Sequence, residues 1–205
     1  MTSNVLVLYY APRTRSVRIR WLFEELGLPY ELRRVPFVPP STGGFFSQAT
    51  PGGKFPVLED GDVTLGESGA ILQYVLERYG DGRLAPSVGS PQRGPFLYWL
   101  HFAESTAFPP IGTMVWHLLY KQDAEQLPSV MEDARDRARI TLDVVEHALA
   151  GREHLLGDFT AADVMMGFTV AAAKLFGLLD ERFPKLSRYL ARLEARPAFR
   201  AATAD

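Results

Sequence analysis

Two hydroxyl side chains, Thr14 and Ser16, follow the first apolar run of the chain and could stabilise a nearby anion. A free thiol has a pKa of about 8.5, and each unit of depression requires about 1.4 kcal/mol of preferential thiolate stabilisation. One charge-assisted hydrogen bond supplies roughly 1.5–3 kcal/mol. A hydroxyl near a helix N-terminus could therefore leave a bound thiol largely ionised near neutral pH. The alternative is that both side chains only cap the helix that follows.

The thiol in such chemistry must come from a ligand, because none of the 205 residues is cysteine. This absence also excludes disulfides and thiolate metal sites. The four histidines do not recur at the three- or four-residue spacing that places two ligands on one helix face, and we expect no metal.

A second pair of candidate residues, Glu67 and Ser68, comes directly after a predicted strand. The first N–H groups of a helix lack internal partners and attract a carboxylate. Ser68 adds a hydroxyl and Glu67 can pair with an ammonium group, so the pair suits the head group of a free amino acid. The alternative is an ordinary helix cap with a favourable charge near the dipole.

A third candidate is the segment Lys54-Phe55-Pro56, which enters another strand. The simpler interpretation is a proline at the first residue of a strand, where no ladder N–H is needed. In the other interpretation, a cis bond at Phe55-Pro56 turns the main chain of Phe55 away from the sheet. That main chain could then pair with an extended peptide ligand.

The overall charge excludes some partners. Lys and Arg number 22 against 24 Asp and Glu, so nothing suggests binding to nucleic acid. The apolar run 5–10 is too short to span a bilayer and no basic segment precedes it. We therefore expect a cytoplasmic protein that does not enter membranes.

The elements that position these residues follow from apolar spacing and from Gly and Pro stops. The first part of the chain is predicted to form a strand at 5–10, a helix at 15–26 and a strand at 30–35, followed by a loop over 36–51. A hairpin of strands at 55–59 and 63–65 comes next, and then a helix that ends at Gly80. The rest is helical, over 96–120 with a break at Pro109-Pro110, 129–149, 161–176 and 186–193. We predict an α/β domain at 1–82, a linker at 83–92 and an all-helical domain at 93–205.

Two features of the helical part have different meanings. Thr160 and Asp163 form a variant of the capping box, which marks the fold and is not a site. Phe108, Ile111 and Met114 lie near the proline pair; they either belong to the core or line a pocket for an apolar cosubstrate.

The motifs 54–58, 67–71 and 160–163, in this order and spacing, resemble those of the cytosolic glutathione transferase family. The run 18–30 is similar to many bacterial and fungal members. The resemblance covers nearly the whole chain and implies a thioredoxin-like first domain, glutathione as cosubstrate and a homodimer.

The resemblance also implies roles for individual residues. Pro56 would be the cis proline, and the main chain of Phe55 would bind the cysteinyl part of glutathione. Glu67 and Ser68 would hold its γ-glutamyl head group, and Lys54 would lie near its glycyl carboxylate.

The hydroxyl that supports the thiolate would be that of Thr14, in a position where serine is more usual, with Ser16 as the alternative. Ala11, together with the three apolar residues near the prolines, would line the electrophile pocket. With no cysteine, the thiol-transfer chemistry of cysteine-type members is implausible.

We therefore expect a transferase that adds glutathione to small apolar electrophiles, with glutathione peroxidase activity as a possible addition. The alternative is a glutathione-binding or ligand-carrier protein of the same fold with little turnover.

Overall fold

The computed structural model describes residues 5–36 and 53–204. The chain divides into two compact units: Met1–Leu84 together with Ala195–Asp205, and Ala85–Glu194. The last residues thus belong with the first unit, whereas the sequence prediction placed them in the helical domain. Apart from Pro36, the loop predicted over 36–51 lies outside the described residues.

The first unit begins with a parallel β-α-β arrangement, as predicted. Strand β1 (Leu6–Tyr10) pairs with β2 (Tyr30–Arg34) in the register Leu6 to Tyr30. Helix α1 (Ser16–Leu26) connects them and buries Trp21 and Leu22 completely. It ends at Gly27, whose φ of 64° is the left-handed conformation that glycine adopts at least cost.

Two antiparallel strands complete the sheet, whose strand order is β2-β1-β3-β4. β3 (Val57–Asp60) and β4 (Val63–Leu65) form the predicted hairpin. β3 begins two residues later than the predicted strand 55–59, because Pro56 has no N–H to donate to the ladder.

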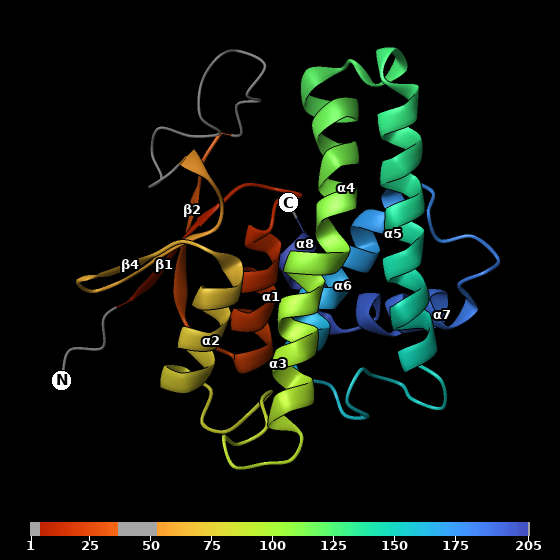
Figure 1. The fold of residues 1–205 in the computed structure, drawn as a ribbon. Coiled ribbons are helices and arrows are strands. Elements are labelled where there is room, and N and C mark those ends of the chain that lie inside the picture. The colour runs from red at the N-terminus through yellow and green to blue at the C-terminus, as the bar shows by residue number, and fades with distance from the viewer. Residues whose placement is uncertain (1–4, 37–52, 205) are drawn as a thin grey trace. The chain divides into compact units, whose positions relative to one another are not determined.

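Helix α2 (Ser68–Tyr79) follows the hairpin and packs beside α1 (Figure 1). Its buried stripe includes Ile71, Leu72 and Val75. The helix ends at Gly80, as predicted. A side chain would not fit at this position, because a Cβ on residue 80 would lie 2.4 Å from the Leu76 carbonyl oxygen.

A short final helix, α8 (Pro197–Thr203), packs on α1 and was not predicted. The ring of Phe199 meets that of Trp21 edge-on with 4.9 Å between centroids. Arg196 donates to both carboxylate oxygens of Glu25, at 2.6 and 2.8 Å. This packing covers α1 with residues that are far away in the sequence.

The second unit begins with a long helical run. Helix α3 (Arg93–Phe102) continues through a π-helical segment, Ala103–Ala107, into α4 (Phe108–Val115) and a second π-helical segment, Trp116–Lys121. The predicted break at Pro109-Pro110 is therefore wrong. The two prolines occupy the first turn of α4, where a missing N–H is tolerated, and the π-helical segment precedes them.

Three further helices complete this unit, in agreement with the predicted positions: α5 (Pro128–Ala148), α6 (Ala161–Leu175) and α7 (Pro184–Glu194). In Figure 1, α4 and α5 run side by side. The predicted capping box opens α6, where the Thr160 N–H donates to Asp163 Oδ2 at 2.8 Å. Within residues 5–36 and 53–204, every helix is too short or too polar to span a lipid bilayer.

Candidate functional site

Strand pairing brings the three candidate segments to one end of the sheet. The last antiparallel pair of β1 and β3 is Tyr9 with Val57, and that of β3 and β4 is Leu58 with Leu65. Two residues beyond the first of these pairs, Phe55 comes opposite the residue that follows β1. Two or three residues beyond the second pair, Phe55-Pro56 comes opposite Glu67-Ser68. Residues far apart in the sequence thus converge within the first unit.

The two hydroxyls after β1 form a compact cluster with the main chain of Ala11. Thr14 Oγ1 and Ser16 Oγ lie within hydrogen-bond distance of each other, at 2.7 Å, and of the Ala11 carbonyl oxygen, at 2.7 and 2.9 Å respectively. Two hydroxyl protons therefore serve three contacts. Ser16 Oγ also accepts the Ala11 N–H at 3.2 Å. Ser16 is fully buried, whereas Thr14 is half-buried.

Neither hydroxyl acts as the N-cap of α1. The cap position belongs to Arg15, which has helical dihedral angles and no capping side-chain bond. The residue before Thr14, Arg13, has a φ of 60°, a conformation that few residues other than glycine adopt. The turn therefore directs the hydroxyls toward Ala11 and leaves Thr14 nearer the surface.

A buried arginine joins this turn to the start of α2. Arg18, on the first turn of α1, is 0% exposed and donates through Nη1 to Ser68 Oγ at 3.1 Å. Arg18 is not among the site residues that the sequence predicts. A charged residue among the apolar residues of a helix could have indicated a buried role. Its partner could not be predicted in this way, because it lies 50 positions away in the sequence.

At the start of α2, Glu67 occupies the cap position with φ 61° and ψ 108°. A non-glycine residue in this region is strained by about 1–3 kcal/mol, and such strain clusters at functional sites. Glu67 is exposed, whereas Ser68 is only 3% exposed. The strained turn thus presents a carboxylate to solvent directly beside a buried hydroxyl.

The Phe55-Pro56 bond is cis, which confirms that prediction. The main-chain N–H and C=O of Phe55 make no backbone hydrogen bond with any other residue that the structure describes. Lys54 is exposed beside them. An extended peptide ligand could therefore use the main chain of Phe55 as a further strand would.

The residues predicted to line an electrophile pocket are buried in the structure. Phe108, Ile111 and Met114 are 5%, 0% and 1% exposed, and Ala11 is 0% exposed. The Phe108 ring stacks on that of Phe168, which lies in the same unit, at 5.9 Å between centroids. This burial favours a core role over direct contact with a ligand. Across the described parts of the chain, no three His, Asp or Glu side chains form a group suited to a metal ion.

Comparison with known proteins relates both parts of the chain to one family. Residues 8–86 match the glutathione S-transferase N-terminal domain, and residues 108–197 match the C-terminal domain. Glutathione S-transferase 3 of Zea mays is 32% identical over 95% of this chain and 91% of its own length.

Solved structures agree. The glutathione transferase URE2P6 of Phanerochaete chrysosporium, in complex with oxidized glutathione, superposes with a TM-score of 0.83 at 29% identity, over 97% of this chain and 94% of its own. A glutathione transferase of Pseudomonas putida, with one glutathione disulfide per subunit, gives 0.80 at 26% identity, over 98% and 91% of the two chains. The chain therefore belongs to the glutathione S-transferase family, and it carries the two domains of that family in their usual order.

Proposed function

We propose that the chain binds glutathione at the start of α1 and α2, lowers the pKa of its thiol, and adds the thiolate to small apolar electrophiles. In this step the thiolate sulfur forms a bond to an electrophilic carbon. The electron pair displaced from that carbon leaves with a leaving group or takes up a proton from water. The nucleophile belongs to glutathione, because the chain has no cysteine.

The observation that carries this proposal is the unequal burial of the paired hydroxyls. Each hydroxyl has one proton, and the Ala11 carbonyl oxygen can accept from either. If Thr14 turns its proton toward a sulfur, Ser16 still satisfies that carbonyl, and the Ser16 N–H still donates to Thr14 Oγ1 at 3.3 Å. The buried Ala11 carbonyl oxygen thus keeps a donor when Thr14 donates outward, and the contact that gives up its proton is the one between the two hydroxyls.

Ser16 lacks this freedom. It is fully buried and already bonds the N–H and C=O of Ala11. Turning its proton away would require a ligand atom to reach a covered oxygen. We therefore assign Thr14 as the hydroxyl that supports the thiolate and Ser16 as the residue that holds the turn in place.

The other groups of glutathione are matched to residues of the chain by their charge and hydrogen-bonding capacity. Its γ-glutamyl group carries an ammonium and a carboxylate, which suit Glu67 and the α2 N-terminus with Ser68. Its cysteinyl main chain suits the main chain of Phe55 beside Pro56, which makes no backbone hydrogen bond with another residue that the structure describes. Lys54 is an exposed cation for the glycyl carboxylate.

The electrophile pocket stays an assignment from the sequence, with Ala11 in the first unit and Phe108, Ile111 and Met114 in the second. All four residues are buried, which favours a core role over direct contact with a ligand. We also propose that the protein is cytoplasmic and a homodimer. Sedimentation equilibrium at micromolar concentration should show twice the 22.9 kDa chain mass, and a monomer would contradict the dimer.

Calorimetric titration with glutathione, followed by assays with a panel of electrophiles and hydroperoxides, tests the function. We expect saturable binding at one site per chain and turnover that falls in Thr14→Val. Binding without turnover would favour the carrier alternative. Absence of binding would contradict both.

A further inference from the structure

A basic pocket lies in the second unit, and none of its lining residues is assigned to glutathione. It encloses about 300 Å³ between the loop after α5 and one face of α7. Its lining consists of Leu149, Gly151, Arg152, Glu153, Lys185, Arg188 and Arg192. Four of these side chains are cationic and one is a carboxylate, so the formal charge of the lining is positive.

The helix supplies three of the cations on one face. Lys185, Arg188 and Arg192 are spaced three and four residues apart on α7, which places them along one stripe. The opposite stripe of α7, including Leu186 and Tyr189, is buried. Amphipathicity alone explains a polar outer face, but it does not explain why only cations line the helix side of the pocket.

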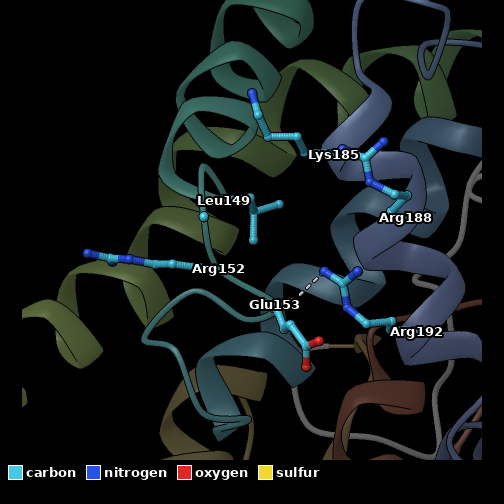
Figure 2. Close-up of a pocket in the computed structure, with 7 residues that line it drawn as sticks. Leu149, Arg152, Glu153, Lys185, Arg188 and Arg192 are labelled. Carbon is cyan, nitrogen blue, oxygen red and sulfur yellow. Dashed lines mark hydrogen bonds between the residues drawn. The ribbon is translucent and has the colours of Figure 1, made fainter.

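The loop supplies the facing wall and holds one cation in place. Arg192 donates through Nη2 to the Glu153 carbonyl oxygen at 2.7 Å (Figure 2). Arg192 Nε is buried and makes no hydrogen bond among the described residues. Arg192 thus has a fixed position, and a ligand in the pocket could reach its guanidinium only through the Nη groups, because Nε is covered.

The other cations differ in how far they are already neutralised. Lys185 Nζ lies 3.3 Å from Glu146 Oε1, and Glu146 also accepts the main-chain N–H groups at the start of α7. Arg188, by contrast, is exposed and makes no hydrogen bond, ion pair or ring contact with any described residue. In Figure 2, Arg188 and Arg192 lie on the same side of Leu149, whereas Arg152 extends away from them.

We propose that this pocket binds a small oxyanion carrying two or more negative charges, a phosphate or a polycarboxylate. Guanidinium groups hold both kinds of ligand through paired N–H···O bonds. Arg188 supplies an uncommitted guanidinium, Arg192 a fixed one, and Lys185 a partly shared ammonium. This site is distinct from the proposed glutathione site and does not depend on it.

Calorimetry with pyrophosphate and with citrate at low ionic strength tests the proposal. We expect binding of at least one anion, with an affinity that falls as salt is raised, since exposed charges are screened. Arg188→Ala should weaken binding by roughly tenfold or more, the loss expected for one charge-assisted contact. Glu153→Gln should strengthen it, because the substitution removes the like charge in the lining.

The matched control is Arg135→Ala. Arg135 is also exposed and makes no hydrogen bond, ion pair or ring contact with any described residue, but it lies on α5 outside the pocket. It should change the affinity by less than about twofold. Stronger binding of pyrophosphate would identify a phosphate ligand and stronger binding of citrate a polycarboxylate; glutathione affinity should stay unchanged in Arg188→Ala. No binding of either anion at millimolar concentration, or an equal effect of Arg135→Ala, would overturn the proposal.

Discussion

The hydroxyl oxygens of Thr14 and Ser16 lie 2.7 Å apart, and each lies within hydrogen-bond distance of the carbonyl oxygen of Ala11. One is half-buried and the other fully buried. Their types alone made both of them candidates for the thiolate partner. Ser16 bonds the N–H and C=O of Ala11, and we propose that Thr14 is the hydroxyl that turns its proton toward the ligand.

The strained backbone at Glu67 leads to a prediction that separates binding from stability. Glu67→Gly should leave the free energy of unfolding unchanged or raise it. The relieved strain, about 1–3 kcal/mol, exceeds the entropic cost of glycine, about 0.5–1 kcal/mol. Glutathione affinity should fall by roughly tenfold or more, because the partner of the ammonium is lost.

Asp81→Gly provides the control, because Asp81 also has a positive φ, 48°, but is not assigned to the site. Denaturant unfolding and calorimetric titration measure the two quantities. Unchanged glutathione affinity in Glu67→Gly would contradict the head-group assignment.

The bond between Arg18 and Ser68 predicts coupling in glutathione affinity. Arg18→Met and Ser68→Ala should each weaken glutathione binding. The double variant should lose less binding free energy than the sum of the two single losses, with a coupling on the order of 1 kcal/mol. The reason is that Arg18 acts by orienting the Ser68 hydroxyl. Arg20→Met is the control: Arg20 is on the same helix but donates to the Ala202 and Ala204 carbonyls. Strictly additive losses would show that Arg18 does not act through Ser68.

The α8 contact predicts a contrast between two ion pairs. Glu25 is 9% exposed and accepts from Arg196 and from Trp21 Nε1, whereas Lys174 and Glu194 are 57% and 36% exposed. Arg196→Ala should lower the free energy of unfolding by about 2 kcal/mol, because a covered carboxylate loses its charged partner. Lys174→Ala should cost less than about 1 kcal/mol. Equal losses in chemical denaturation would mean that the α8 contact adds little.

The capping box predicts unequal costs for its two members. Asp163 is fully buried and accepts from the Leu155 and Thr160 N–H groups and from the Tyr189 hydroxyl. Asp163→Ala should therefore cost about 3 kcal/mol or more, against about 1 kcal/mol for Thr160→Ala. Turnover per folded molecule should stay the same in both. A loss of turnover without a loss of stability would mean that this cap belongs to a site.

Periodicity and stop residues were sufficient to predict most of the elements. The β-α-β start, the hairpin and the ends of α1 and α2 at Gly27 and Gly80 follow from local rules that act within a few residues. The predicted helix break at Pro109-Pro110 was wrong, because the helix continues through the prolines, with a π-helical segment directly before them. Short-range signals do not reveal such a compensation.

Motifs predict candidate site residues, whereas tertiary packing decides how these residues lie. The cis Phe55-Pro56 bond was predicted from its motif and is confirmed, and the assignment of Glu67 and Ser68 to glutathione stays a prediction. The role of Arg18 depends on a partner 50 residues away, and the choice between Thr14 and Ser16 depends on burial. The basic pocket likewise requires a loop and a helix to be placed against each other, which no sequence pattern in this chain shows.

The most direct test of the central claim is the pKa of the thiol of bound glutathione, followed by thiolate absorbance against pH in the saturated complex. Wild type should titrate below the value of about 8.5 for a free thiol, and Thr14→Val should raise the bound pKa by about 1–2 units. Ser16→Ala should move it little and should instead lower the free energy of unfolding by about 1–3 kcal/mol, because the Ala11 N–H loses its buried acceptor. A larger pKa shift in Ser16→Ala than in Thr14→Val, or no shift in either variant, would contradict the account.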